Sequence, residues 1–227
     1  MKEGLLEKIK ASGYWRINLR PARTLEKELT LKHCREVVAA ANVSLRGWDY
    51  PHVANRNDDQ VGYGNNDGFI ENWTEWKTML EFWRMYQSGQ FLHYRNMWED
   101  YEEVEHAPQK PFLSIVGAIY VFTEVAEFAN RLATNSGYPE GVDISIAAVN
   151  TVGRRLWVGG NRMPFIEPMT TGVERVEVTG TLLTGASTIP PIDIASQLLM
   201  SFFDQFGWQP NLDQIRSDQE RLLKRQF

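Results

Sequence analysis

The sequence predicts a single α+β domain over residues 1–227, in which antiparallel strand groups pack around one long central helix and further helices follow at the C-terminus. Two observations lead to this fold class. An aromatic-rich stretch at 69–94 alternates in the manner of a strand meander, and a strongly apolar stretch at about 113–133 has the length of a buried helix. No linker or shift in composition divides the chain, so we expect one core.

The meander prediction depends on alternation and on one turn. Residues 69–76 divide into two alternating sets, one for each face of a strand, and two further β-prone segments follow at 81–86 and 91–94. The two sets are Phe69, Glu71, Trp73 and Glu75, and Ile70, Asn72, Thr74 and Trp76. Between the last two segments, Gln87-Ser88-Gly89-Gln90 has the composition of a hairpin tip. A helix over 75–86 fits the same residues nearly as well and is the competing interpretation.

The central helix is predicted from Leu113 to Ala133, because this segment is apolar on most sides, as is typical of a helix at the centre of a fold. Residues 43–68 are rich in turn-forming residues, and we expect a long irregular connection there that includes 62–68. The rest of the sequence predicts helices over 3–11, 25–41, 193–206 and 212–225, and strands over 14–19 (ending before Pro21), 142–146, 154–158 and 175–183.

The composition is that of an ordinary folded protein with a generous aromatic share of 12%. A single cysteine, Cys34, excludes an intrachain disulfide, which fits a reducing compartment. The first residues carry lysine and glutamate without an apolar run, and no stretch has the apolar length of a membrane span. We therefore expect a soluble, cytoplasmic protein that makes no contact with a membrane.

The net charge of −5 is unevenly distributed along the chain. Residues 1–47 hold ten Lys and Arg against five Asp and Glu, whereas residues 48–112 hold five against twelve. The chain as a whole is not basic enough for a domain-wide nucleic-acid surface, but its N-terminal segment could form a local basic face. The side chains that would bind nucleic acid there are Arg16, Arg20, Arg23, Lys27 and Arg35.

The most conspicuous candidate site is the segment from Arg46 to His52. It combines a guanidinium, an indole, a carboxylate, a phenol and an imidazole, on Arg46, Trp48, Asp49, Tyr50 and His52. In a ligand- or partner-binding site, Arg46 would hold a phosphate or carboxylate and the aromatic rings would stack on a ring of the ligand. His52 could move protons near neutral pH. A structural interpretation competes: Trp48 and Tyr50 plug the end of the core while Arg46 pairs with Asp49.

Sharp catalytic signatures, such as a phosphate loop, His-Glu-x-x-His or a nucleophile elbow, are absent from the sequence. A weaker pattern consists of Asp49 followed by Glu75 and Lys77 on a later strand. It resembles the pattern of metal-dependent restriction-type nucleases, although Pro51 follows Asp49 instead of preceding it. The resemblance implies nuclease or phosphohydrolase activity, in which the carboxylates hold a divalent metal and the lysine orients the attacking water. Outside this alternative we predict no metal and no cofactor, and Glu75 and Lys77 would simply be the polar face of a strand.

The tryptophans favour a binding role over catalysis. Trp73, Trp76, Trp83 and Trp98 crowd one stretch, and alternation along the meander would turn some of them outward. An exposed aromatic face is typical of a contact surface. We therefore expect a non-catalytic recognition or assembly module. It would bind a protein partner, a second copy of itself or an anionic ligand through the meander and the Arg46–His52 segment.

Overall fold

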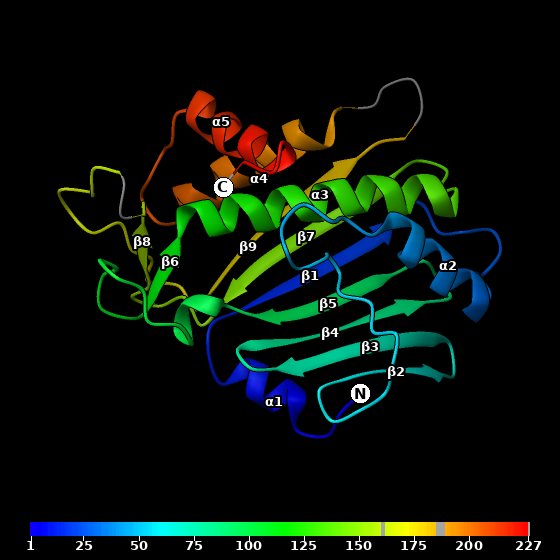
Figure 1. The fold of residues 1–227 in the computed structure, drawn as a ribbon. Coiled ribbons are helices and arrows are strands. Elements are labelled where there is room, and N and C mark those ends of the chain that lie inside the picture. Colours follow the sequence, from blue (N-terminus) through cyan, green and yellow to red (C-terminus); the bar gives the residue numbers. More distant parts are fainter. Residues whose placement is uncertain (160–161, 185–188, 227) are drawn as a thin grey trace.

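The computed structural model describes residues 1–159, 162–184 and 189–226, and its centre is one antiparallel sheet of seven strands (Figure 1). The strands of this sheet are β1 (Tyr14–Pro21), β2 (Val61–Asn66), β3 (Phe69–Trp76), β4 (Met79–Tyr86), β5 (Phe91–Asn96), β7 (Val142–Val149) and β9 (Arg175–Leu182). Their order across the sheet is β2-β3-β4-β5-β1-β7-β9. A short parallel pair, β6 (Phe112–Ser114) and β8 (Arg155–Trp157), lies at one end.

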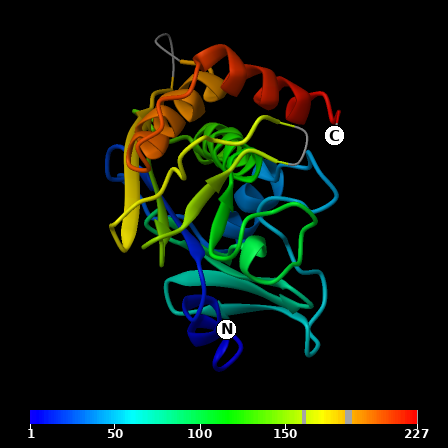
Figure 2. The same ribbon diagram turned by 90° about the vertical axis from the view of Figure 1, so that its left-hand side faces the viewer.

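The helices cover the sheet unequally. They are α1 (Leu5–Lys10), α2 (Leu31–Ala41), α3 (Ile115–Ser136), α4 (Pro191–Asp204) and α5 (Leu212–Leu223), with the 3-10 turn η1 at Trp98–Asp100. The long helix α3 crosses one face of the sheet, where it contacts both α2 and α4, and α5 packs on α3 and α4 (Figures 1 and 2). The short helix α1 packs on β4 and β5. Among the residues that the structure describes, no helix combines the length and the apolar character that crossing a bilayer requires.

Alternation along the strands separates two apolar clusters. On β1 and β4, Trp15 and Trp83 belong to the main core under α3, whereas their neighbours Tyr14 and Phe82 belong to a small cluster with α1. The two clusters therefore lie on opposite faces of the sheet. The part of this opposite face that α1 leaves uncovered carries polar side chains such as Arg16, Arg20 and Asp143.

The long central helix and the C-terminal helices confirm the predicted α+β class. Helix α3 begins at Ser114, whose hydroxyl accepts a hydrogen bond from the Gly117 backbone N–H at 3.0 Å. It ends at Gly137, which has a left-handed φ of 66° that glycine adopts without strain. The meander and the predicted strands at 142–146 and 175–183 are parts of one sheet, because β1 pairs with β5 of the meander on one side and with β7 on the other. The predicted strand at 154–158 is β8 and belongs to the separate parallel pair.

The meander is confirmed, and its hairpin tip is the predicted one. Strands β4 and β5 pair in antiparallel register, and the Tyr86 N–H donates to the Gln90 carbonyl at 2.8 Å. Gly89 at the tip has a positive φ of 87°, which explains the glycine. The competing helix over 75–86 is wrong, since only Lys77 and Thr78 separate β3 from β4.

The predicted loop at 62–68 is wrong, because most of it is the edge strand β2. The glycines that suggested a loop have a packing reason. A Cβ atom on Gly62 would lie 2.5 Å from the indole of Trp73 on the neighbouring strand, so only glycine lets the ring lie across β2. Asp67 and Gly68 form the two-residue turn to β3.

The predicted helix at 25–41 begins six residues later than expected, at Leu31. Thr30 caps it, because its hydroxyl accepts from the His33 N–H at 3.1 Å. The residue before this cap is bound to the hairpin tip, where the Leu29 N–H donates to the Gln87 carbonyl at 2.8 Å. Strand β1 also runs through Pro21 instead of stopping before it.

Candidate functional site

The Arg46–His52 segment lies on the α3 side of the sheet, and its side chains alternate between inward and outward positions. Arg46 points inward and forms a bidentate ion pair with Glu124 of α3, with both N–O distances at 2.7 Å. Burial disfavours the charge on Arg46, but the Glu124 carboxylate outweighs this effect and raises the pKa of the guanidinium. The predicted pair with Asp49 is wrong, because an exposed carboxylate cannot compete with a buried one that offers two hydrogen bonds.

Trp48 is held by a hydrogen bond from its indole N–H and by stacking of its ring on two neighbours. Its indole N–H donates to the Glu81 Oε1 atom at 2.9 Å. Its ring stacks on Trp76, with centroids 5.8 Å apart and an interplanar angle of 4°, and on His52, with centroids 4.3 Å apart. The stack of His52, Trp48 and Trp76 ties the segment to the end of β3.

Tyr50 joins a buried chain of hydrogen-bonding groups. The Tyr50 hydroxyl lies 3.3 Å from Nδ1 of His93, and Nε2 of His93 lies 2.9 Å from the Glu81 Oε2 atom. Burial disfavours the Glu81 carboxylate, but hydrogen bonding and electrostatic attraction from His93 outweigh this effect and lower the pKa of Glu81. Burial raises the pKa of Tyr50 well above its ordinary value. Glu81 thus accepts from both Trp48 and His93, and every member of the chain has a partner.

The five predicted binding residues therefore divide into two groups. Arg46, Trp48 and Tyr50 contact internal partners, and this agrees with the interpretation in which they close the end of the core. Asp49 is exposed, and His52 stacks on Trp48 while its backbone carbonyl accepts from the Trp83 indole at 2.7 Å. Trp48 and His52 also line a pocket of about 340 Å³ together with Trp76. The residues after the segment, at 53–55, line this pocket and a second cavity of about 390 Å³.

The pattern of Asp49, Glu75 and Lys77 is divided between the two faces of the sheet. Glu75 lies on the α1 side, where it pairs with Lys8 and with Lys2, the latter at 2.7 Å. The adjacent Trp76 faces the Arg46–His52 segment, and the Lys77 ammonium lies over the Trp76 ring at 4.8 Å. Within the described part of the chain, no group of three or more His, Cys, Asp or Glu side chains could hold a metal ion.

The basic side chains of the N-terminal segment lie on different surfaces. Arg16 is on the sheet face opposite α3, where its Nε donates to the Tyr94 hydroxyl at 3.2 Å. Arg20 lies on the same face of β1, and Arg23 pairs with Glu140 at 3.3 Å. Arg35 is on α2, on the other side of the sheet, and Lys27 is exposed in the segment before that helix.

The most exposed apolar side chains belong to one part of the sequence, the β7–β9 connection, whose described residues are 150–159 and 162–174. Among the described residues, the four large apolar side chains with the greatest exposure all belong to it. They are Ile166 at 102% exposure, Met163 at 90%, Val152 at 56% and Val173 at 46%. Scattered apolar residues are normal on a protein surface, but four on a single connection form a candidate contact surface.

This connection is anchored to the body of the protein. Arg162 forms a bidentate ion pair with Asp218 of α5, one of whose N–O distances is 2.9 Å. Phe165 packs edge-on against Trp208, with ring centroids 5.4 Å apart. The Leu156 N–H donates to the Met169 carbonyl at 2.9 Å. Met163 and Ile166 therefore project from a segment whose neighbours are fixed.

A groove of about 410 Å³ lies beside these projecting side chains. Ala107 and Pro108 line it on one side, and Trp157, Val158 and Phe165 line it on the other. Its lining includes the residues of β8, which lies beside β6 at the left of Figure 1 and toward the viewer in Figure 2. The sequence carries one signal for this surface. Residues 163–169 are mostly apolar, yet their prolines exclude a regular helix or central strand.

Comparisons with known proteins leave the function to be argued from this geometry. No protein-family model matches the chain, no curated protein is significantly similar to it in sequence, and no solved structure is significantly similar to it.

Proposed function

We propose that this protein is an assembly module that forms a symmetric homodimer through the β7–β9 connection. The observation that carries the proposal is the concentration of exposed Val152, Met163, Ile166 and Val173 on that connection. Exposed apolar surface of this kind is stabilised when a partner removes it from water, at about 25 cal/mol per Å².

A second copy is the favoured partner because the surface contains both a projection and a recess. Met163 and Ile166 project, and the groove between Pro108 and Trp157 lies next to them. In a two-fold interface each subunit presents the same patch to the other. A projection beside a groove satisfies this condition, since the projection of one copy can enter the groove of its partner.

The test is the oligomeric state of the purified protein. We expect a dimer by light scattering and by sedimentation equilibrium at about 50 µM protein. Ile166→Glu should weaken dimerisation by about a hundredfold, because it replaces a buried apolar contact by a charge without a partner. Leu183→Glu is the matched control: Leu183 is 41% exposed but follows the opposite end of β9.

Two results would contradict the proposal. One is a wild-type protein that remains monomeric at concentrations up to about 500 µM, because its dissociation constant would then be about 1 mM or weaker, too weak for a specific interface. The other is an equal loss of dimer in Leu183→Glu, since that would place the interface elsewhere.

A further inference from the structure

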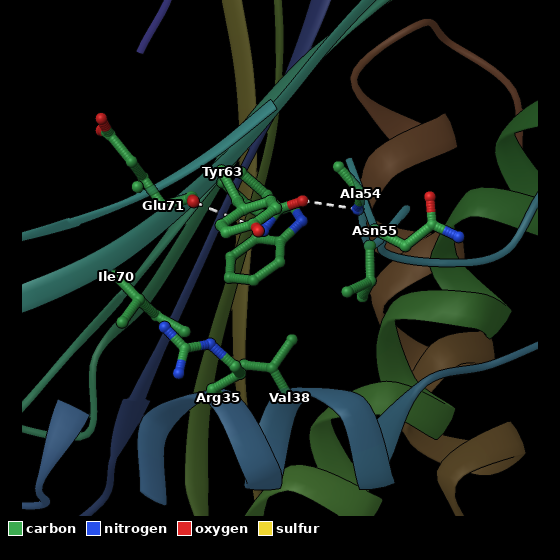
Figure 3. A pocket seen from close by; sticks show the side chains of 11 residues that line it. Arg35, Val38, Ala54, Asn55, Tyr63, Ile70 and Glu71 are labelled. Carbon is green, nitrogen blue, oxygen red and sulfur yellow. Dashed lines mark hydrogen bonds between the residues drawn. The ribbon is translucent and has the colours of Figure 1, made fainter. Parts of the chain in front are cut away.

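A second feature of the molecule is a cavity of about 390 Å³ between α2 and the part of the sheet formed by β2, β3 and β4 (Figure 3). This volume is within the range of small-molecule sites. Val38 of α2, Ile70 of β3 and Trp83 of β4 form its inner wall, and all three side chains are buried. Residues 53–55 form the opposite wall. This inner wall is therefore apolar, and the cavity is shaped by five separate parts of the chain, because β2 also lines it.

The polar groups on the inner wall already have partners. The Trp83 indole N–H donates to the His52 carbonyl, and Asn72 accepts from the Ala54 N–H at 2.6 Å and donates to the Glu71 carbonyl at 3.3 Å. Among the described residues, some buried side-chain N and O atoms lack a hydrogen-bond partner, but none of these atoms belongs to a residue of the cavity wall. A ligand that enters the interior thus needs an apolar body and no hydrogen-bonding group there.

Only one of the described residues that line the cavity has a carboxylate, and this carboxylate points away from the cavity. Glu71 contributes to the wall, but its carboxylate lies on the opposite face of the sheet, where it pairs with Arg84 at 3.0 Å and with the N-terminal amine. Figure 3 shows this side chain pointing away from the other labelled groups. No negative charge therefore faces the interior from this wall.

The mouth of the cavity carries a cation. Arg35 on α2 lines the cavity and is exposed, and it donates to the Asn65 Oδ1 atom at 2.6 Å, so it bridges α2 and the edge strand β2. Arg35 forms no ion pair within the described part of the chain. A guanidinium that binds one neutral amide keeps most of its donors for another acceptor.

We propose that this cavity binds a small monocarboxylate, with its apolar body against Trp83 and its carboxylate on Arg35. A guanidinium matches a carboxylate in geometry and can bind it with two parallel hydrogen bonds. One arginine neutralises one negative charge, so a monoanion fits the site better than a polyphosphate, which requires several cationic or backbone donors. This site is distinct from the proposed dimer surface, and neither depends on the other.

The first experiment titrates the full-length protein with 3-phenylpropionate, 3-phenylpropanamide and inorganic phosphate. Calorimetry gives the affinities, and amide and indole NMR shifts give the location. We expect the carboxylate to bind with a Kd of about 1 mM or tighter and the amide about tenfold more weakly. The shifted signals should include the Trp83 indole N–H and the backbone of residues 53–55.

Two variants separate the cation from the cavity. Arg35→Gln should weaken binding of 3-phenylpropionate by about tenfold, because it removes the charge but keeps an amide donor. Val38→Phe should abolish binding by filling the cavity. Arg20→Gln is the control for nonspecific loss of positive charge, since Arg20 is exposed on the other face of the sheet.

The proposal is overturned if the carboxylate and the amide bind equally well, if phosphate binds as tightly as the carboxylate, or if Arg20→Gln has the effect expected of Arg35→Gln. Absence of binding by all three probes to the folded wild-type protein overturns it as well. Circular dichroism of each variant establishes that a lost affinity is not a lost fold.

Discussion

In the Arg46–His52 segment the polar groups turn inward, to Glu124, Glu81 and His93, whereas in the β7–β9 connection apolar groups turn outward, at Met163 and Ile166. The segment looked functional because it mixes charged, aromatic and imidazole groups. The structure gives its inward-facing groups internal partners, so the mixture closes one end of the core.

The difference between the two regions teaches where free binding capacity lies. A buried charge persists only when it is paired and hydrogen-bonded, and a side chain that meets this condition internally has little left for a ligand. An exposed large apolar side chain has no such internal partner. The side chains that are most available to a partner or ligand are therefore Ile166, Met163 and Arg35. The Arg46–His52 segment, despite its mixture of polar and aromatic groups, is less available.

The largest expected effect concerns the ion pair of the inward-facing Arg46 with Glu124. Glu124→Ala should lower the free energy of unfolding by about 3–5 kcal/mol, because it leaves Arg46 desolvated without its carboxylate. Urea unfolding measures the change. Glu127→Ala, one turn along the same helix at a half-buried position, should change it by less than about 1 kcal/mol.

A double variant sharpens the same point. Arg46→Met combined with Glu124→Leu should recover most of the loss, because a buried ion pair can often be replaced by apolar groups of similar size. If Glu124→Ala and Glu127→Ala had equal effects, the ion pair would not be a brace and the segment would regain its candidacy as a binding site.

The elements that could be predicted from the sequence are those with local signals. Strands β3, β4 and β5 follow from alternation, their hairpin tip from Ser88-Gly89, and α3 from its continuous apolar run. Strand β2 could not be predicted in this way. Its glycines favour a loop locally, and it is a strand because it pairs with β3 and because Gly62 makes room for Trp73.

The partners of the candidate site were also beyond local reasoning. Arg46 and Glu124 are 78 residues apart, Tyr50 and His93 are 43 apart, and Trp48 and Glu81 are 33 apart. No periodicity connects such positions. The residue types at 46–52 suggested contacts with a ligand or partner, whereas the contacts that Arg46, Trp48 and Tyr50 make in the structure are to groups of the same chain.

The next prediction concerns a buried carboxylate at the base of the β7–β9 connection. Glu99 is buried and accepts from the Ser114 N–H at 3.0 Å, but it forms no ion pair within the described residues. The neighbouring Arg154 instead pairs with Asp100 at 2.8 Å. Burial therefore raises the pKa of Glu99 from 4.5 to about 7, although the Ser114 N–H and Arg154 oppose the change.

A raised pKa means that the folded state holds the proton more tightly than the unfolded state. The stability of the protein should therefore fall by about 3 kcal/mol as the pH rises from about 4.5 to about 7, and this component should level off above that range. Glu99→Gln should remove the component while it keeps the acceptor for Ser114. Chemical unfolding across this pH range tests the prediction, with the exposed Glu105→Gln as control. An unchanged pH profile in Glu99→Gln would assign the titration to other groups.

The smallest expected effect concerns Ile166, and it distinguishes a role of this side chain in the stability of the monomer from a role in self-association. Because this side chain is already fully exposed, Ile166→Ala should change the free energy of unfolding of the monomer by less than about 0.5 kcal/mol. In contrast, Ile119→Ala at a buried position of α3 should cost about 2–5 kcal/mol.

The dependence of the melting temperature on protein concentration tests whether Ile166 takes part in self-association. Dimerisation adds stability by mass action, so the melting temperature of the wild type should rise with protein concentration, whereas that of Ile166→Ala should rise less. Equal concentration dependence in both would mean that Ile166 takes no part in self-association. A loss of stability in Ile166→Ala at every concentration would mean that the side chain packs within its own chain, and the β7–β9 connection would then be an inward-facing brace like the Arg46–His52 segment.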